Sequence, residues 1–356
     1  MRTTSCFLLG CAAASGADLY AFDPTWKPAW PMASGQLSGV DVAHVAGGKT
    51  TLVYVTQREN PAAPQVLILD AATGEQAASF EGGGWLAPGG AHGINVEESP
   101  DAVGAADTWP HLRVWVEDFT NHTLTAFSGN GAKLLQIGTP GEAGNGTGTA
   151  GLQFGNLADS ALDSRVGETD VYVADGDGGS ANRVVKLTVT NNPFSWAFQW
   201  ATDHIYHNPH SIALHKRTGL LLLADREQNK TTLLRASNGE DLGEFDCGLR
   251  YGPAGADQVP FGVRTLSLGG MDLGFVAIMD NPQDGRNQKV AVLDLSKLNA
   301  KDGARSPCAV LQTLDIPTTF SGPHLMGVDR VSGDLYAALV ADAPESTVLR
   351  WKLKKN

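Results

Sequence analysis

Short apolar runs separated by glycine- and aspartate-containing turns recur along the whole chain. The clearest unit is residues 208–229. It holds a strand starting near His210, a turn ending at Gly219, a run of four leucines and an alanine, and a polar loop from Asp225. Apolar runs of this length, bounded by turn residues, are typical of buried strands. The unit is therefore predicted to be a β-hairpin with a polar loop at its end.

The same strand–turn–strand pattern occurs six times, over residues 38–70, 92–138, 156–200, 208–245, 260–294 and 324–353. Repeats of about 40 to 60 residues, each with four short strands, are typical of β-propellers. The last copy lacks a fourth strand, and the aromatic segment 25–30 is expected to supply it and close the ring. A β-sandwich is the alternative, but it gives no reason for the repeat. The predicted fold is an all-β, six-bladed β-propeller.

Composition agrees with this fold and excludes one class of partner. The 356 residues are 42% hydrophobic and include 42 glycines and 18 prolines, as expected for many short strands joined by turns. The net charge is −12, and no long basic run is present to neutralise phosphates. We therefore expect one propeller domain over residues 18–356 and no nucleic-acid partner.

The first 17 residues have the features of a secretory signal peptide. Arg2 supplies the positive charge, residues 6–14 the apolar stretch, and residues 15–17 a small-residue cleavage site. A lipoprotein cleavage site ending at Cys11 is the alternative. No other segment reaches the roughly 18 apolar residues that a membrane helix needs. The sequence thus predicts an extracellular protein, secreted through the secretory pathway, with no membrane span.

Cysteines and glycosylation motifs fit this route. Removal of the signal peptide leaves Cys247 and Cys308. Two cysteines in an exported chain are expected to pair, which contributes about 4 kcal/mol in the chain-entropy model. Two separate buried thiols are the alternative. Asn121, Asn145 and Asn229 each begin an Asn-x-Thr triplet and are the candidate glycosylation sites.

Three histidines share one place in the repeat. His92, His210 and His324 begin the innermost strands of blades two, four and six. Alternate blades of a six-bladed ring bring them to one mouth of the channel with near-threefold symmetry. Three neutral imidazoles can hold a zinc ion and leave a position open. Iron and copper are the alternative metals, and a favoured strand-start residue is the alternative without metal.

Two arginines are expected at the same mouth. Arg58 and Arg226 each lie at the end of a second strand, on blades one and four. An arginine beside a metal indicates an anionic group such as a carboxylate, which guanidinium binds through two parallel hydrogen bonds. Loop capping through surface carboxylates is the alternative. Serine-hydrolase elbows, phosphate-binding loops and Cys-x-x-Cys pairs do not occur, so those chemistries lack support.

These motifs resemble those of the NHL-repeat propellers, and the resemblance extends over nearly the whole chain after residue 17. The chain is similar to the secreted group of NHL repeat-containing protein 3, and through it to peptidyl-α-hydroxyglycine α-amidating lyase. Cys247 and Cys308 also match that group. The most specific segments are residues 137–141, 152–154, 173–179 with 182–183, 209–211, 224–226, 323–325 and 328–330.

The resemblance implies a site and a reaction. The lyase family binds zinc through three histidines, which match His92, His210 and His324, and its two active-site arginines match Arg58 and Arg226. Its reaction releases glyoxylate from a C-terminal hydroxyglycine and leaves a peptide amide. The substrate would then be a peptide C-terminus or another small carboxylate.

Two positions depart from the lyase pattern. The family has a catalytic tyrosine after the second strand of blade three, and here Asp177 takes its place in the run Asp-Gly-Asp-Gly-Gly. Losing a positioned proton-transfer group costs about 10²- to 10⁴-fold in rate. The family also has a calcium-binding Asp after its last zinc histidine, where this chain has Leu325, so calcium is not expected. Asp177 remains a catalytic candidate, and the alternative is a non-catalytic extracellular propeller that binds a protein partner.

Overall fold

The structure is a computed structural model of the 356-residue chain. It describes residues 18–29, 36–45, 49–58, 60–98, 112–178, 181–191, 194–203, 205–249, 258–280, 288–317, 322–340 and 347–354. The predicted signal peptide at residues 1–17 lies outside this set. Among the described residues, no helix is long and apolar enough to cross a membrane.

Short strands make up most of the described chain. In order they are β1 (Tyr20–Phe22), β2 (Gln36–Val45), β3 (Thr50–Arg58), β4 (Val66–Asp70), β5 (Gln76–Phe80), β6 (Ala91–Glu98), β7 (Leu112–Asp118), β8 (Thr123–Ser128), β9 (Lys133–Ile137), β10 (Leu157–Arg165), β11 (Glu168–Asp175), β12 (Arg183–Asn191), β13 (Phe194–Ala201), β14 (Pro209–His215), β15 (Leu220–Asp225), β16 (Lys230–Arg235), β17 (Asp241–Glu244), β18 (Gln258–Leu268), β19 (Met271–Asp280), β20 (Lys289–Asp294), β21 (Ala309–Asp315), β22 (Pro323–Val328), β23 (Leu335–Leu339) and β24 (Thr347–Leu353). Three 3₁₀ turns accompany them, η1 (Gly82–Gly84), η3 (Arg226–Gln228) and η4 (Gly303–Arg305).

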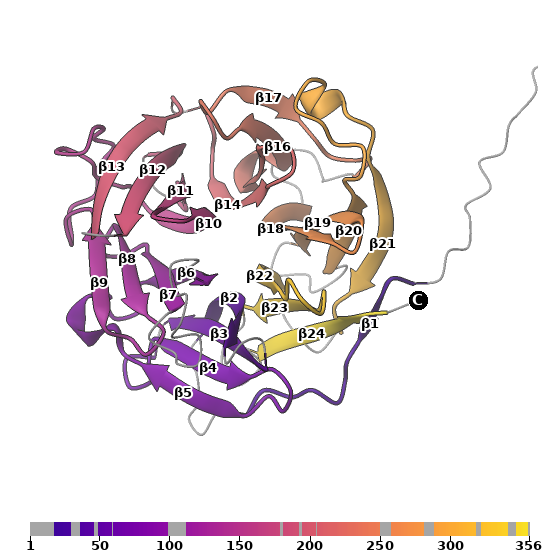
Figure 1. The fold of residues 1–356 in the computed structure, drawn as a ribbon, viewed down its shortest axis with the longest axis horizontal. Helices are drawn as coiled ribbons and strands as arrows, with labels where there is room; N and C mark the ends of the chain where they lie inside the picture. Colours follow the sequence, from indigo (N-terminus) through magenta and orange to yellow (C-terminus); the bar gives the residue numbers. More distant parts are fainter. Residues whose placement is uncertain are drawn as a thin grey trace, which may run out of the picture.

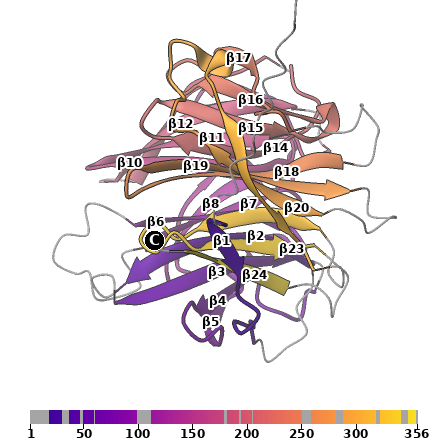
Figure 2. The same cartoon turned by 90° about the vertical axis from the view of Figure 1, so that its right-hand side faces the viewer.

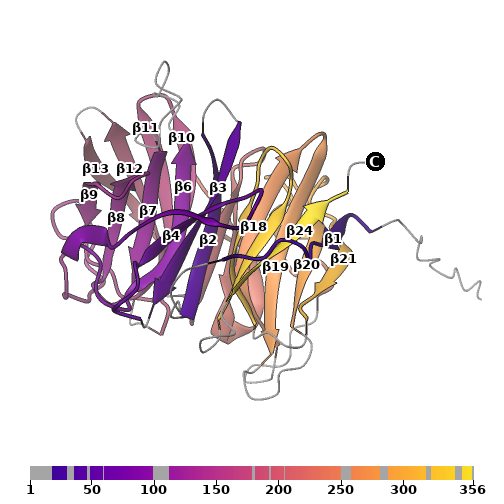
Figure 3. The same ribbon diagram turned by 90° about the horizontal axis from the view of Figure 1, so that it is seen from below.

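These strands form six four-stranded antiparallel sheets over the described residues, arranged in a ring around a central axis (Figure 1). Blades one to five are β2–β5, β6–β9, β10–β13, β14–β17 and β18–β21, in chain order. Blade six is β22, β23, β24 and β1. The side views show the sheets standing next to one another around the axis (Figures 2 and 3). The predicted six-bladed propeller is confirmed.

The hydrophobic core consists of layers between neighbouring blades. Six clusters of buried apolar side chains fill the six interfaces of the described ring, from blades one and two round to blades six and one. Inner strands are buried on both faces, which is why β15 reads as an uninterrupted apolar run, whereas the outer strand β13 alternates between exposed and half-buried positions. Each blade is therefore stable only between its two neighbours.

The ring closes with an N-terminal strand, but not the predicted one. The fourth strand of blade six is β1, with Tyr20 opposite Leu353 and Phe22 opposite Trp351. Segment 25–30 was the wrong choice because Asp23 turns the chain first, accepting hydrogen bonds from the Thr25 backbone N–H and hydroxyl.

After that turn the chain leaves blade six. Trp26 packs edge-on against Tyr336, with ring centroids 5.4 Å apart, and Ala29 makes one bridge to Glu75 of blade one. Residues 25–29 thus cross from blade six to blade one instead of adding a strand.

A disulfide joins the outer parts of blades four and five. Cys247 follows β17 and Cys308 precedes β21, and their Cα atoms lie 5.2 Å apart. The predicted pairing is present in the structure. The bond links two blades at their rims, far from the central axis.

Asp23 is predicted to stabilise the closed ring. Its buried carboxylate accepts hydrogen bonds from Arg350 and pairs with Lys352, whose ammonium lies 2.9 Å away. Burial opposes ionisation, but the bonds from Thr25, Lys352 and Arg350 bring the Asp23 pKa below its usual value. Asp23→Ala leaves a buried guanidinium unpaired and is expected to lower the free energy of unfolding by about 3 kcal/mol. Urea denaturation measures this, with Asp18→Ala as the exposed control. Equal stability of the two variants would show that the pair does not hold the closure.

Candidate metal centre

Three buried histidines meet at one end of the central channel. His92, His210 and His324 are each the second residue of the innermost strand of their blade, and they are 0%, 0% and 2% exposed. Their ring centroids lie 5.2, 4.7 and 4.7 Å apart, close to an equilateral triangle. One ligand atom from each ring lies within 4.8 Å of the others. The predicted convergence of these histidines is confirmed.

A β-bulge on each inner strand places these side chains. The pairing of each inner strand with the second strand shifts at the same level on all six blades. A bulge leaves one residue out of the ladder and re-aims its side chain. The residues at the shifts are Ser38, Ala158, His210 and Phe261, and the pairs His92–Gly93 and His324–Leu325. Even-numbered blades thus have histidine there, and odd-numbered blades do not.

The odd-numbered blades hold the histidines in place through backbone carbonyls. The Nδ1 atoms of His92, His210 and His324 lie 2.7, 2.7 and 2.6 Å from the carbonyl oxygens of Ala158, Phe261 and Ser38. A carbonyl only accepts, so each Nδ1 carries the proton. In a neutral ring the Nε2 lone pair is then available at the centre. This orientation by a second partner is the usual support of a metal-ligating histidine.

Burial favours the neutral form that a metal requires. It holds the pKa of His210 and of His324 well below the usual histidine value. At His210 the charge of Asp177 opposes this lowering of the pKa and that of Arg226 adds to it, and at His324 the neighbouring histidines and Arg58 add to it. The imidazoles of His210 and His324 are therefore neutral at physiological pH. The donors of the candidate site are thus three imidazole nitrogens, which fit a three-histidine metal site.

Asp177 lies directly beside the histidines. One carboxylate oxygen is 3.1 Å from His92 Nε2, and the other is 3.0 Å from Arg226 Nη1. Burial alone raises the Asp177 pKa, but its contacts with His92 and Arg226 bring it well below its usual value. The carboxylate is therefore ionised, and it joins the metal site to an arginine.

Both predicted arginines lie at this mouth, each over a phenylalanine ring. The Arg226 guanidinium is 5.0 Å from the ring centroid of Phe261, and that of Arg58 is 5.9 Å from Phe119. Phe119 also packs against His92, and Phe261 against His210 and His324, at centroid distances of 5.0 to 5.8 Å. The two phenylalanines exclude water from the sides of the histidine triangle.

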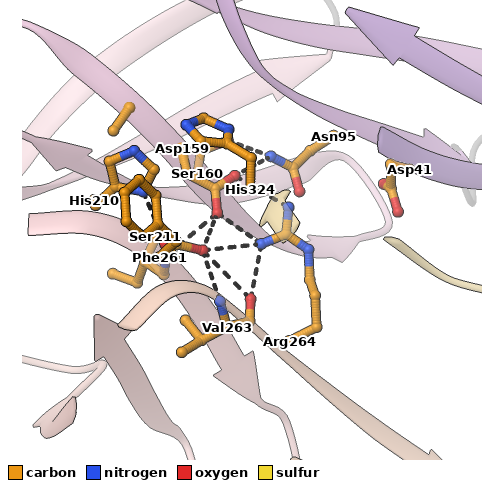
Figure 4. A network of polar contacts seen from close by, with 12 residues as sticks. Asp41, Asn95, Asp159, Ser160, His210, Ser211, Phe261, Val263, Arg264 and His324 are labelled. Atoms are coloured by element: carbon orange, nitrogen blue, oxygen red, sulfur yellow. Dashed lines mark hydrogen bonds and ion pairs between the residues drawn. The ribbon is translucent and has the colours of Figure 1, made fainter. Parts of the chain in front are cut away.

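A charged layer lies one residue deeper in the channel (Figure 4). Asp159 receives two hydrogen bonds from Arg264, at 2.6 and 3.1 Å, and one from the Ser211 hydroxyl at 2.6 Å. Asp159 follows Ala158, and Ser211 follows His210, so this layer fixes the backbone beside two histidines. Buried ion pairs held by several hydrogen bonds in this way make an interior rigid.

Below this layer the channel widens into a cavity of about 200 Å³. Asp41, Asn95, Ser160 and Arg264 are among its lining residues. The charged layer thus separates the histidine end of the channel from this cavity.

Sequence reasoning missed the phenylalanines, the carbonyl acceptors and the charged layer. A signal was available for Phe261 and Ala158 alone, because the alignment of the repeats places them at the histidine position of odd-numbered blades. Of the glycosylation candidates, Asn145 is exposed, Asn121 is half-buried and Asn229 is buried at 8% exposure. Glycosylation of the three stays a prediction, as does the absence of calcium beside Leu325.

Comparisons with known proteins identify relatives. No protein-family profile matches the chain. NHL repeat-containing protein 3 of Mus musculus is 27% identical over 332 residues, which cover 90% of this chain and 83% of that protein. The human protein of the same name is 29% identical over 251 residues, which cover 68% of this chain and 64%, less than two thirds, of that protein. This chain is thus a six-bladed β-propeller that is similar to these two NHL repeat-containing proteins. Neither name refers to a lyase, so that relation stays a prediction.

Among solved structures, the chain of "Structure of U3-55K" aligns with 88% of this chain and 80% of its own length. The TM-score is 0.47 and the identity is 12%. A likeness this weak supports no conclusion about function.

The contribution of the buried Glu117 carboxyl group of β7 to stability can be tested by changing the pH. Burial, reinforced by the charge of Asp159, raises the Glu117 pKa to about 8. The folded protein therefore keeps a proton that the unfolded chain has already lost above pH ~4.5. This contribution to stability is complete below pH ~4.5 and is lost as the pH rises to about 8. We expect Glu117→Gln to be more stable than wild type at pH 9 and close to it at pH 4.5. Thermal unfolding measures both. A stability difference that does not change with pH would contradict the assignment.

Proposed function

We propose that this chain is a secreted, zinc-binding propeller that presents its metal and two arginines to a carboxylate at one mouth of the channel. The observation that carries the proposal is the set of three Nδ1–carbonyl bonds, which leaves three Nε2 atoms facing one another. A histidine that only stabilises a strand has no need to meet two others in this way. The ligand class is a small carboxylate or a peptide C-terminus.

Zinc suits the donors better than other common metals. Three imidazole nitrogens without a cysteine match the three-histidine zinc sites, whereas magnesium and calcium prefer oxygen. Copper and iron also accept imidazole, and metal analysis distinguishes them. When bound, zinc acts as a Lewis acid that polarises an oxygen ligand.

The arginines give the mouth its preference for anions. Arg226 and Arg58 both act on the histidine site, since their charges lower the pKa of His210 and His324. Phe119 and Phe261 reduce solvent around them, which strengthens their attraction for a carboxylate. Residues of the chain itself thus support the binding of a carboxylate at this mouth.

Binding is better supported than lyase turnover. Asp177 replaces the tyrosine of the lyase family, and its lowered pKa keeps it ionised near neutral pH. An ionised carboxylate has no proton to donate, whereas a phenol with a pKa near 10 does. The general acid–base step of that family therefore has no matching group at this position.

The disulfide supports an extracellular location. Cys247–Cys308 lies within the propeller, and disulfides of this kind persist in oxidising compartments and are rare in the cytosol. Together with the signal-like residues 1–17, this favours secretion. Analysis of culture medium after expression of the full chain tests that location, and retention in the cytosol would contradict it.

Metal content tests the central proposal. The purified wild-type protein is expected to contain close to one zinc per chain by elemental analysis, and His210→Ala is expected to lose it. His215→Ala is the matched control. His215 is buried on the same strand, but its Nδ1 bonds to Thr218, away from the site, so zinc should remain. A wild type that contains no metal and takes up no zinc would contradict the proposed metal site. It would favour a propeller that acts as a scaffold for a protein partner.

Turnover is tested separately with a peptidyl-α-hydroxyglycine. We expect zinc-loaded wild type to release glyoxylate no faster than background. Asp177→Tyr restores a proton donor, and its rate is expected to rise by at least about 10²-fold. Release by the wild type that disappears in Arg226→Ala would show instead that this propeller is an enzyme with Asp177 in place.

A further inference from the structure

We infer that Asp177 is a fourth protein ligand of the metal and occupies the place of an external carboxylate. This inference rests on the proposed metal site. It changes the character of that site, because three histidines alone leave a metal open, whereas three histidines and an aspartate enclose it. An external carboxylate would then have to displace Asp177 before it could reach both the metal and Arg226.

The spacing of Asp177 from His92 is that of two ligands of one ion. Zinc–nitrogen and zinc–oxygen bonds are about 2.0 to 2.2 Å, so neighbouring ligand atoms of a tetrahedral ion lie about 3.3 Å apart. The observed distance from Asp177 Oδ2 to His92 Nε2 is 3.1 Å. The side chain therefore needs no rearrangement to share an ion with His92.

Electrostatics also call for a cation at this point. His92 donates its Nδ1 proton to the Ala158 carbonyl, so a neutral ring turns its Nε2 lone pair toward the carboxylate. Two lone pairs at 3.1 Å repel unless a proton or a metal ion neutralises them. The other two Nε2 atoms lie nearby, which favours a metal over a single proton.

The second carboxylate oxygen fixes the side chain from the other direction. Asp177 Oδ1 is 3.0 Å from Arg226 Nη1, so with a metal bound beside Oδ2 each oxygen would have its own positively charged neighbour. A substrate carboxylate bound between metal and arginine would make the same two contacts. Asp177 is thus an intramolecular equivalent of the expected ligand.

Backbone hydrogen bonds hold Asp177 in this position independently of the histidines and Arg226. The N–H groups of Gly176 and Asp177 both donate to the Asn156 carbonyl at 2.9 Å, and the Asn156 side-chain amide donates back to the Asp177 carbonyl. A Cβ at Gly176 would lie 2.4 Å from Cδ of Pro209, the residue before His210. Glycine is required there because the loop packs directly against the strand that supplies the second histidine.

Cobalt(II) replacement tests the ligand by spectroscopy, independently of turnover. Wild-type protein loaded with Co²⁺ is expected to give a visible spectrum that added acetate leaves unchanged. In Asp177→Ala the fourth position is vacant and Arg226 Nη1 has lost the Asp177 carboxylate, so acetate should shift the spectrum. The affinity for Co²⁺, measured against a competing chelator, is expected to fall by more than the roughly 10- to 100-fold that the loss of a carboxylate supporting a ligand costs. Asp177→Asn, close to isosteric, should bind the metal with an affinity between the two.

Glu227→Ala is the matched control. Glu227 also contacts Arg226, with its carboxylate oxygen 3.1 Å from Nε, but its side chain is 57% exposed and, among the described residues, is shown bonded to that arginine alone. This variant should keep the wild-type spectrum, affinity and indifference to acetate. Circular dichroism establishes that every variant is folded.

The outcomes separate this inference from the proposed function. Equal Co²⁺ affinity in wild type and Asp177→Ala, with the same response to acetate, would overturn the role of Asp177 and leave the three-histidine site intact. A wild type that binds neither zinc nor cobalt would overturn both. If Glu227→Ala lost as much Co²⁺ affinity as Asp177→Ala, Asp177 would act only as a partner of Arg226 and not as a metal ligand.

Discussion

The hydrogen bond from a histidine Nδ1 to a carbonyl of the next blade is the interaction on which the metal centre depends. It does two things at once. It joins an even-numbered blade to its odd-numbered neighbour at the axis, and it turns the Nε2 lone pair toward the centre. The alternation requires an even number of blades, since a donor blade must always meet an acceptor blade. Six blades give three such pairs, and hence three ligands.

The layers around the histidines keep this arrangement fixed. Blades approach so closely that a Cβ at Gly93 would lie 2.6 Å from the Ala158 carbonyl oxygen, the acceptor of the His92 bond. One residue deeper, the Asp159–Arg264 pair holds the same strands with charge-assisted hydrogen bonds. The ligand geometry is thus set by backbone and by a buried ion pair, so little reorganisation is needed when a metal enters.

The fold was predictable because its signal repeats. Each blade alone shows only a hairpin pattern, but six copies in one order exclude most other β folds, and they place His92, His210 and His324 in the same register. The closing strand was predicted wrongly because three residues, Tyr20 to Phe22, are too short to show an alternating pattern. The aromatic residues that follow them gave a stronger signal but pack between blades.

The finer features of the site depend on contacts that a sequence does not display. A carbonyl acceptor such as that of Ser38 has no side-chain signature. Phe119 lies just after β7, and its packing against His92 depends on the fold of blade two. Asp177 was singled out only through the resemblance to the lyase family, and its contacts with His92 and Arg226 depend on the path of the loop after β11.

The two arginines are therefore not an equivalent pair, although their places in the repeat suggested a symmetric clamp. Arg226 is bound to Asp177 and Glu227, both on its own side of the ring. Arg58 lies over Phe119 and acts on His324, at a separate part of the mouth. A carboxylate that approached the metal beside Arg226 would meet the negative charge of Asp177. Arg226 should consequently become available to an external carboxylate only after Asp177 has moved.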